Sequence, residues 1–133
     1  METAYDDLGE ECRGIEHEYG EAVRILADPY SMSLLTEMCT PSTGQPRFND
    51  LLDILYRIVL QRAIAHELPR SLIECDTNMK QYTPRGVFRG QVIDRATRAV
   101  TVNVARAGTV PTQICQQMLH QVRDPQGVRQ EHA

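Results

Sequence analysis

The chain has 133 residues, of which 41% are hydrophobic and 24% are charged, and its formal net charge is -4. This composition is that of one ordinary globular domain, and it excludes a low-complexity or collagen-like chain because enough apolar surface is present for a core. No apolar run approaches the roughly 20 residues that cross a bilayer, and the acidic N-terminus lacks the basic and apolar regions of a secretory signal. We therefore expect a cytoplasmic protein with no membrane partner.

Cysteine spacing and aromatic content exclude two further classes of protein. The four cysteines are widely spaced and include no C-x-x-C pair, so buried free thiols are expected rather than a zinc knuckle or a disulfide scaffold. They are Cys12, Cys39, Cys75 and Cys115. Aromatic residues make up only 5% of the chain, and tryptophan is absent. The chain lacks the aromatic side chains on which single-stranded nucleic acid stacks, and we expect no nucleic-acid partner.

Charge is unevenly distributed along the chain. Residues 1–28 hold nine acidic and two basic residues, whereas residues 80–106 hold six basic residues and a single acidic one, Asp94. A local basic stretch in an acidic chain favours a specific small anion, such as a phosphate group, over a long polyanion. The alternative is that these residues are exposed charges on a hairpin.

Three helices are expected in the first half of the chain, where apolar residues recur every three or four positions. They cover residues 10–27, 30–38 and 47–67. The first helix is acidic, so its polar face is expected in solvent, and Gly14 and Gly20 weaken its helical pattern. The third helix is apolar on several sides, which predicts packing against more than one neighbour.

The apolar pattern changes after Pro69, where strands are expected. Residues 72–75 and 86–93 each have the pattern of a strand, the second with a bulge at Gly90, in a region where a β-hairpin is expected. Residues 99–104 form a β-branched run that is typical of a mostly buried strand. The sequence thus predicts a mixed α+β or α/β fold.

The junction between this third strand and a last helix, residues 111–122, carries the most chemical information. A glycine ahead of a helix lets backbone amides approach a ligand, and the helix start adds a partial positive charge. Arg106 adds a cationic fork suited to phosphate oxygens. Residues 106–109 therefore predict an anion site, the alternative being that the glycine serves only the geometry of the turn. The polar tail, residues 123–133, is expected to be loop or disorder.

Other candidate residues are weaker. Arg85 and Arg89, on the expected hairpin, either close over a bound phosphate or occupy an exposed face. The four histidines have no acidic residue or cysteine at metal-ligand spacing, so no metal site built from side chains is indicated. Cys115 and His120 lie five positions apart on the last helix and face different directions, which favours Cys115 as a core residue.

The segment Val100 to Gly108, a strand followed by Arg-Ala-Gly and an apolar helix, resembles the uracil phosphoribosyltransferases. The loop at residues 42–48 before a long helix, and Asp-Pro-Tyr at residues 28–30, are also similar to that family. The resemblance covers residues 28–122. It implies N-terminal helices, a β-hairpin and the first strand–turn–helix unit of a type I phosphoribosyltransferase fold, preceded by an acidic helix over residues 1–27 and followed by the polar tail.

The resemblance also implies an activity. The family transfers a phosphoribosyl group from phosphoribosyl pyrophosphate to uracil in pyrimidine salvage, with Mg²⁺ bound alongside the substrate. Its Arg-Ala-Gly turn holds the pyrophosphate, which by resemblance assigns that role to Arg106, Ala107, Gly108 and the adjoining Thr109. Catalysis then rests on positioning and on stabilising the departing charge.

The chain also departs from the family pattern. The family's Asp-Pro-Met-x-Ala-Thr-Gly-Gly loop for the 5′-phosphate and its uracil-recognition segment have no counterpart in these 133 residues. We therefore expect the chain to be incomplete and inactive by itself, with no catalytic residue assigned, and to form a homo-oligomer or bind a complementing chain. The alternative is a non-catalytic association or regulatory module derived from the same fold.

Overall fold

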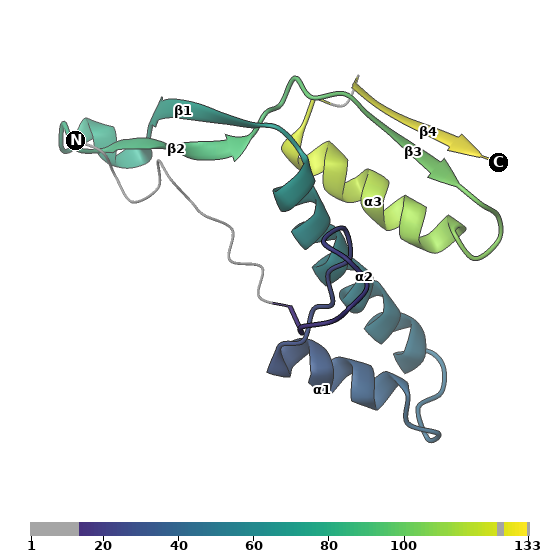
Figure 1. The fold of residues 1–133 in the computed structure, drawn as a ribbon. Helices are drawn as coiled ribbons and strands as arrows, with labels where there is room; N and C mark the ends of the chain where they lie inside the picture. The colour runs from purple at the N-terminus through teal and green to yellow at the C-terminus, as the bar shows by residue number, and fades with distance from the viewer. Residues whose placement is uncertain (1–13, 125–126, 133) are drawn as a thin grey trace.

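Three α-helices, one short 3-10 helix and two small two-stranded sheets make up the part of the chain that the structure describes, residues 14–124 and 127–132 of a computed structural model (Figure 1). In chain order these elements are α1 (Pro29–Met38), α2 (Arg47–Glu67), β1 (Arg70–Asp76), η1 (Asn78–Gln81), β2 (Val87–Ile93), β3 (Ala99–Asn103), α3 (Thr109–Val122) and β4 (Val128–His132). The mixture of helix and sheet agrees with the predicted α+β class.

Helices α1 and α2 begin and end close to where the sequence predicts. Asp28 caps α1, because its Oδ1 accepts a hydrogen bond from Ser31 N at 2.9 Å and its Oδ2 accepts one from the Ser31 hydroxyl at 2.7 Å. Helix α2 packs against both α1 and α3, which confirms the prediction of more than one neighbour. Its Leu51 is fully buried. Helix α2 thus joins the N-terminal part of the chain to α3 and the β3–β4 sheet.

An ion pair connects the end of α1 to the start of α2. Arg47 donates from Nε to Glu37 Oε1 at 2.7 Å and from Nη2 to Oε2 at 2.9 Å. Hydrogen bonding to Arg47 lowers the pKa of the Glu37 carboxyl. Both side chains remain about half exposed, so water screens the pair, and its main effect is to orient the loop between the two helices.

The predicted N-terminal helix is wrong for residues 14–27, and residues 10–13 lie outside the described part of the chain. Residues 14–27 form an extended loop in which Ile15 N donates to Ile25 O at 2.9 Å. Gly20 turns the chain back on itself with φ of 94°, a conformation that residues with a side chain rarely adopt. The loop lies beside α2 (Figure 1) and buries its apolar residues only partly there.

Strands β1 and β2 form an antiparallel hairpin in the region where the sequence predicts one. Their register is unbroken along both strands, and Gly90 lies directly opposite Ile73. The predicted bulge at Gly90 is therefore wrong, because the glycine occupies an ordinary ladder position. The far end of the hairpin is closed by η1 and by Thr77, whose hydroxyl donates to Gly86 O at 2.8 Å.

Strands β3 and β4 pair in parallel, and α3 is the crossover between them. Helix α3 packs on both strands and buries Ile114 and Leu119, each 4% exposed, with Val128 of β4 at 8%. The expectation of loop or disorder for the tail is thus wrong for residues 128–132. That segment has one apolar residue, so its pairing rests on main-chain hydrogen bonds with β3, which no side-chain pattern reveals.

One face of β3 is open. Val100 and Val102 are 59% and 63% exposed, whereas Asn103, on the α3 side, is 1% exposed. The prediction of a mostly buried strand is therefore wrong. The β-branched run specifies a strand, but burial of both faces requires a second layer, and the described residues place α3 on one face only. Within the same residues no helix is long and apolar enough to cross a membrane.

Replacing Asp28 by alanine is expected to lower the melting temperature by a few degrees, because the first turn of α1 loses its cap. The matched control is Asp28→Asn, since asparagine caps without charge. Hydrogen bonds from Ser31 lower the pKa of Asp28 below its ordinary value of 3.8. The stability contributed by the charged carboxylate is therefore present above that value and is lost as the pH falls through the lower folded pKa.

Thermal melts of the three proteins between about pH 5 and about pH 2 check this assignment, and Asp28→Asn should lose less stability over that range than the natural chain. An alanine variant that melts with the natural chain at neutral pH would contradict the capping role.

Candidate functional site

The turn between β3 and α3 contains the predicted anion-binding residues. It leaves the carboxyl end of β3 and leads directly into the first turn of α3. Gly108 N donates to Val104 O at 3.1 Å and Thr109 N donates to Arg106 O at 3.1 Å, and the Ala105–Arg106 peptide bond is cis. The structure therefore places Arg106, Gly108 and Thr109 at the strand edge where the sequence predicts them.

Gly108 is required by close packing within this turn. A Cβ added there would lie 2.7 Å from Asn103 Oδ1 and 2.8 Å from Val104 O, closer than side-chain carbons approach other atoms. Asn103 is buried, and its Nδ2 donates to the Thr109 hydroxyl at 3.3 Å. The geometric role of the glycine is thus established, and any ligand specificity of the turn depends on Arg106.

Arg106 is available to an anion. Its side chain is exposed, and within the described part of the chain that side chain forms no hydrogen bond or ion pair. A guanidinium that remains charged at every physiological pH and has no internal partner can bind phosphate oxygens with two parallel N–H groups. The arrangement is compatible with the predicted role of Arg106.

Fewer free backbone N–H groups are available to a ligand at the start of α3 than its sequence pattern predicts. The amides of Gly108, Thr109 and Thr112 donate to carbonyls of the chain itself, and Pro111 has no N–H. An anion at this turn would therefore depend mainly on the Arg106 guanidinium and on the partial positive charge of the helix start.

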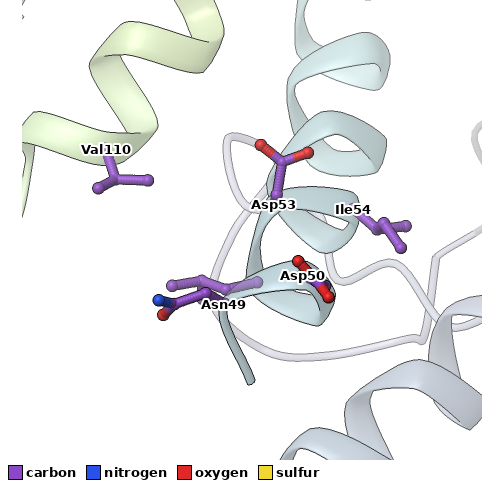
Figure 2. A pocket seen from close by; sticks show the side chains of 6 residues that line it. Asn49, Asp50, Asp53, Ile54 and Val110 are labelled. Carbon is purple, nitrogen blue, oxygen red and sulfur yellow. The ribbon is translucent and has the colours of Figure 1, made fainter. Parts of the chain in front are cut away.

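A cavity of about 570 Å³ lies between the first half of α2 and the first turn of α3. Figure 2 shows Val110 of α3 facing the side chains of α2 across this space, with Asp50 and Asp53 on the α2 wall. Asn49, Leu52 and Ile54 complete the lining. The sequence analysis did not predict this acidic wall. The pattern that indicates it is present in the sequence, since the two acidic side chains lie three positions apart on one helix.

The acidic wall is partly neutralised. Arg57 donates from Nε to Asp53 Oδ2 at 2.8 Å and from Nη2 to Gln117 Oε1 of α3 at 3.0 Å. This bridge holds α2 against α3 and leaves Asp50 as the acidic side chain of the wall with no described hydrogen bond. Because like charges repel, a diphosphate would avoid this wall and remain on the Arg106 side.

The described residues offer no ready-made magnesium site built from side chains. Among the described residues no three His, Cys, Asp or Glu side chains are grouped to hold a metal ion, and Asp53 is bound by Arg57. The resemblance implies a Mg²⁺ ion, and this stays a prediction. The ion would be bound by oxygens of the diphosphate and would enter the site together with it.

Arg85 and Arg89 are not brought to Arg106. Arg85 precedes β2 and Arg89 lies within it, opposite Glu74. Figure 1 shows the β1–β2 hairpin and the β3–α3 turn at opposite sides of the molecule. In this arrangement the two hairpin arginines do not contribute to a site at the turn.

The cysteines divide into two kinds. Cys115 is only partly buried, so the prediction of a core residue is met in part. This burial raises the pKa of its thiol and keeps it protonated, which argues against a nucleophile. Cys39 and Cys75 are exposed free thiols, so the expectation of buried thiols is wrong for both, and Cys12 lies outside the described residues.

Comparison with models of protein families gives no match to this chain, and comparison with curated proteins gives none either. The interpretation of the turn therefore rests on its residues and their geometry.

Replacing Gly108 by alanine is expected to lower the melting temperature, because the added methyl group would meet Asn103 and the Val104 carbonyl. We expect a loss of about 1–3 kcal/mol in the free energy of unfolding, typical of overpacking. Denaturant unfolding measures it, and Gly44→Ala is the matched control, since a Cβ at Gly44 meets nothing within 4 Å. Equal stability of the two variants would contradict the close packing described above.

Proposed function

We propose that the β3–α3 turn binds the pyrophosphate group of phosphoribosyl pyrophosphate, in a protein related to the uracil phosphoribosyltransferases. The observation that supports this most directly is the exposed Arg106 guanidinium, without an internal partner among the described residues, at the carboxyl edge of a parallel strand. Ligands of open α/β folds bind at that edge. The chemical identity of the ligand is proposed from the resemblance of this turn to the Arg-Ala-Gly turn of the uracil phosphoribosyltransferases.

In this proposal Arg106 acts on the leaving group. As the bond between ribose C1 and the pyrophosphate oxygen breaks, its electron pair stays on the oxygen, and C1 becomes positive before the uracil nitrogen bonds to it and releases its proton to water. A fixed guanidinium beside the departing oxygens stabilises this charge without any covalent step. Gly108 and Asn103 hold the turn in the shape that presents Arg106. The 133 residues supply no segment for uracil or for the 5′-phosphate, so the chain by itself should bind the diphosphate without turnover.

Pyrophosphate is expected to raise the melting temperature of the chain, by about 5 °C at ten times its Kd. Arg106→Ala should abolish that rise, and Arg106→Lys should retain part of it, because lysine keeps the charge and loses the planar fork. Arg62→Ala, an exposed arginine of α2, is the matched control. The same rise in Arg106→Ala would remove the assignment of the turn.

A second candidate function is a non-catalytic association module. The observation that favours it is the open face of β3, where Val100, Val102 and the following Val104 are 59%, 63% and 70% exposed. A run of exposed β-branched residues along one strand is the kind of surface that another chain covers. This function does not exclude the first, because an incomplete domain would use the same face to bind a complementing chain.

Light scattering coupled to size-exclusion chromatography is expected to show a dimer or larger species, because pairing would remove the β3 valines from water. Val102→Lys should shift the association equilibrium toward the monomer. Met79→Lys, at an exposed apolar position of η1, should leave that equilibrium unchanged. A natural chain that is monomeric and stable would contradict this association function.

A further inference from the structure

An apolar groove runs along one side of α2. It consists of two cavities, one of about 290 Å³ between α1 and α2 and one of about 300 Å³ between α2 and the loop of residues 14–27. Leu26 and Val59 line both cavities, so the two are neighbouring parts of one groove. The lining residues of α2 extend from Leu52 to His66, which is roughly 20 Å of helix. The groove is therefore long and narrow.

The part of the groove between α1 and α2 is apolar. All of its described lining residues except Ser31 and Tyr56 are leucine, isoleucine, valine or methionine. The Ser31 hydroxyl already donates a hydrogen bond to the cap of α1. Met32, Leu35 and Val59 are 43%, 39% and 54% exposed. Because water leaves such a surface when an apolar group covers it, this part of the groove favours an apolar occupant.

The other end of the groove is positively charged. Arg24 of the loop and Arg62 of α2 line it, and both side chains are exposed. The acidic residue among its described lining residues is Glu67. Two guanidinium groups against one carboxylate leave this end net positive with His66 neutral. An anion from solvent can therefore reach both arginines directly.

The position of Arg24 is fixed by its surroundings. Its Nη2 forms a hydrogen bond with His66 Nε2, and because arginine only donates, this imidazole nitrogen is the acceptor. The loop that carries Arg24 is closed by the hydrogen bond from Ile15 N to Ile25 O at 2.9 Å. Arg24 is exposed, so its other N–H groups are open to an anion. The guanidinium thus has a defined place at the charged end of the groove.

A ligand that matches both parts of the groove has an alkyl chain and an anionic head. A peptide helix is about 10–12 Å across, so it would lie over cavities of this size and place only single side chains in them. An extended alkyl chain is narrow enough to enter both. We infer that the groove binds a long-chain carboxylate, a free fatty acid. Its chain lies between α1 and α2, and its carboxylate oxygens accept hydrogen bonds from Arg24 and Arg62.

The groove is separate from the site at Arg106. None of the described residues that line it belongs to β3 or α3, and Figure 1 shows α1 and the β3–α3 turn in different parts of the molecule. Pyrophosphate has no alkyl chain, and water screens its attraction to exposed arginines, so it should not compete for the groove. The inference does not depend on the function proposed for Arg106.

The test is isothermal titration calorimetry of the full chain with octanoate, decanoate and dodecanoate. It is carried out below their micelle-forming concentrations and at about pH 8, where carboxylates are ionised. Affinity should rise about four-fold for each added methylene group, because each one leaves water. Decanoate should bind more tightly than 1-decanol, which has the same chain without the charge. An apolar surface alone would give the reverse order, because it pays the cost of desolvating the carboxylate.

Two variants test the charged end. Arg24→Gln and Arg62→Gln should each weaken decanoate binding about five-fold, the loss of one charge-assisted hydrogen bond that water screens. Both should bind 1-decanol as the natural chain does. Arg62→Gln carries the test because it leaves the loop and its contact with His66 in place. The matched control is Arg85→Gln, an exposed arginine ahead of β2, which should not change either affinity.

Two further variants test the apolar part. Val59→Glu, in the middle of the groove, should abolish binding of decanoate and of 1-decanol, whereas Val102→Glu, on the open face of β3, should leave both unchanged. Equal decanoate affinities in Arg62→Gln and the natural chain, or tighter binding of 1-decanol than of decanoate, would overturn the inference. So would a chain that binds no carboxylate and becomes monomeric in Val59→Glu, which would assign the groove to a second copy of the chain.

Discussion

Strands β3 and β4 run in the same direction, so the chain must return along the full length of the sheet between them, and α3 makes that return. This constraint organises the second half of the molecule. It buries Ile114 and Leu119 against one face of the strand pair. It also separates two connections, one at each end of the same helix, and each connection presents an arginine. The parallel pairing therefore places the β3–α3 turn with Arg106 and the α3–β4 connection with Arg123 at opposite ends of α3.

The two ends differ in their electrostatics. At the β3–α3 turn a single exposed guanidinium lies in water, near an α2 wall that carries Asp50 and Asp53, so Arg106 and the partial positive charge of the helix start are the features that favour an anion there. At the opposite end the Arg123 guanidinium is buried, and the exposed Arg95 and Arg98 line the same cavity as Arg123. Charge interactions are stronger where water is excluded. The buried Arg123 charge therefore interacts more strongly with its surroundings than the exposed Arg106 charge does.

Local chemistry made much of the fold predictable. The caps and proline positions around α1, the uninterrupted apolar surface of α2 and the β-branched run of β3 each specify an element from neighbouring residues alone. The same is true of Arg106 and Gly108, which the printed order places between a strand and a helix. For residues 14–27 the same reasoning gave a wrong prediction. Their apolar spacing suits a helix, but Gly20 adopts a positive φ that turns the chain back on itself.

By itself, then, the sequence determined where most helices and strands form and which arginine lies in the β3–α3 turn, because those features depend on residues close along the chain. Only the tertiary structure decided that residues 128–132 become a strand, that Val100 and Val102 face outward, and that Arg123 is buried. Each of these depends on segments distant in sequence: main-chain pairing of β4 with β3, the presence of one helical layer rather than two, and the closure of the turn before β3 over the end of α3. The spacing of apolar side chains along the sequence does not reveal such contacts.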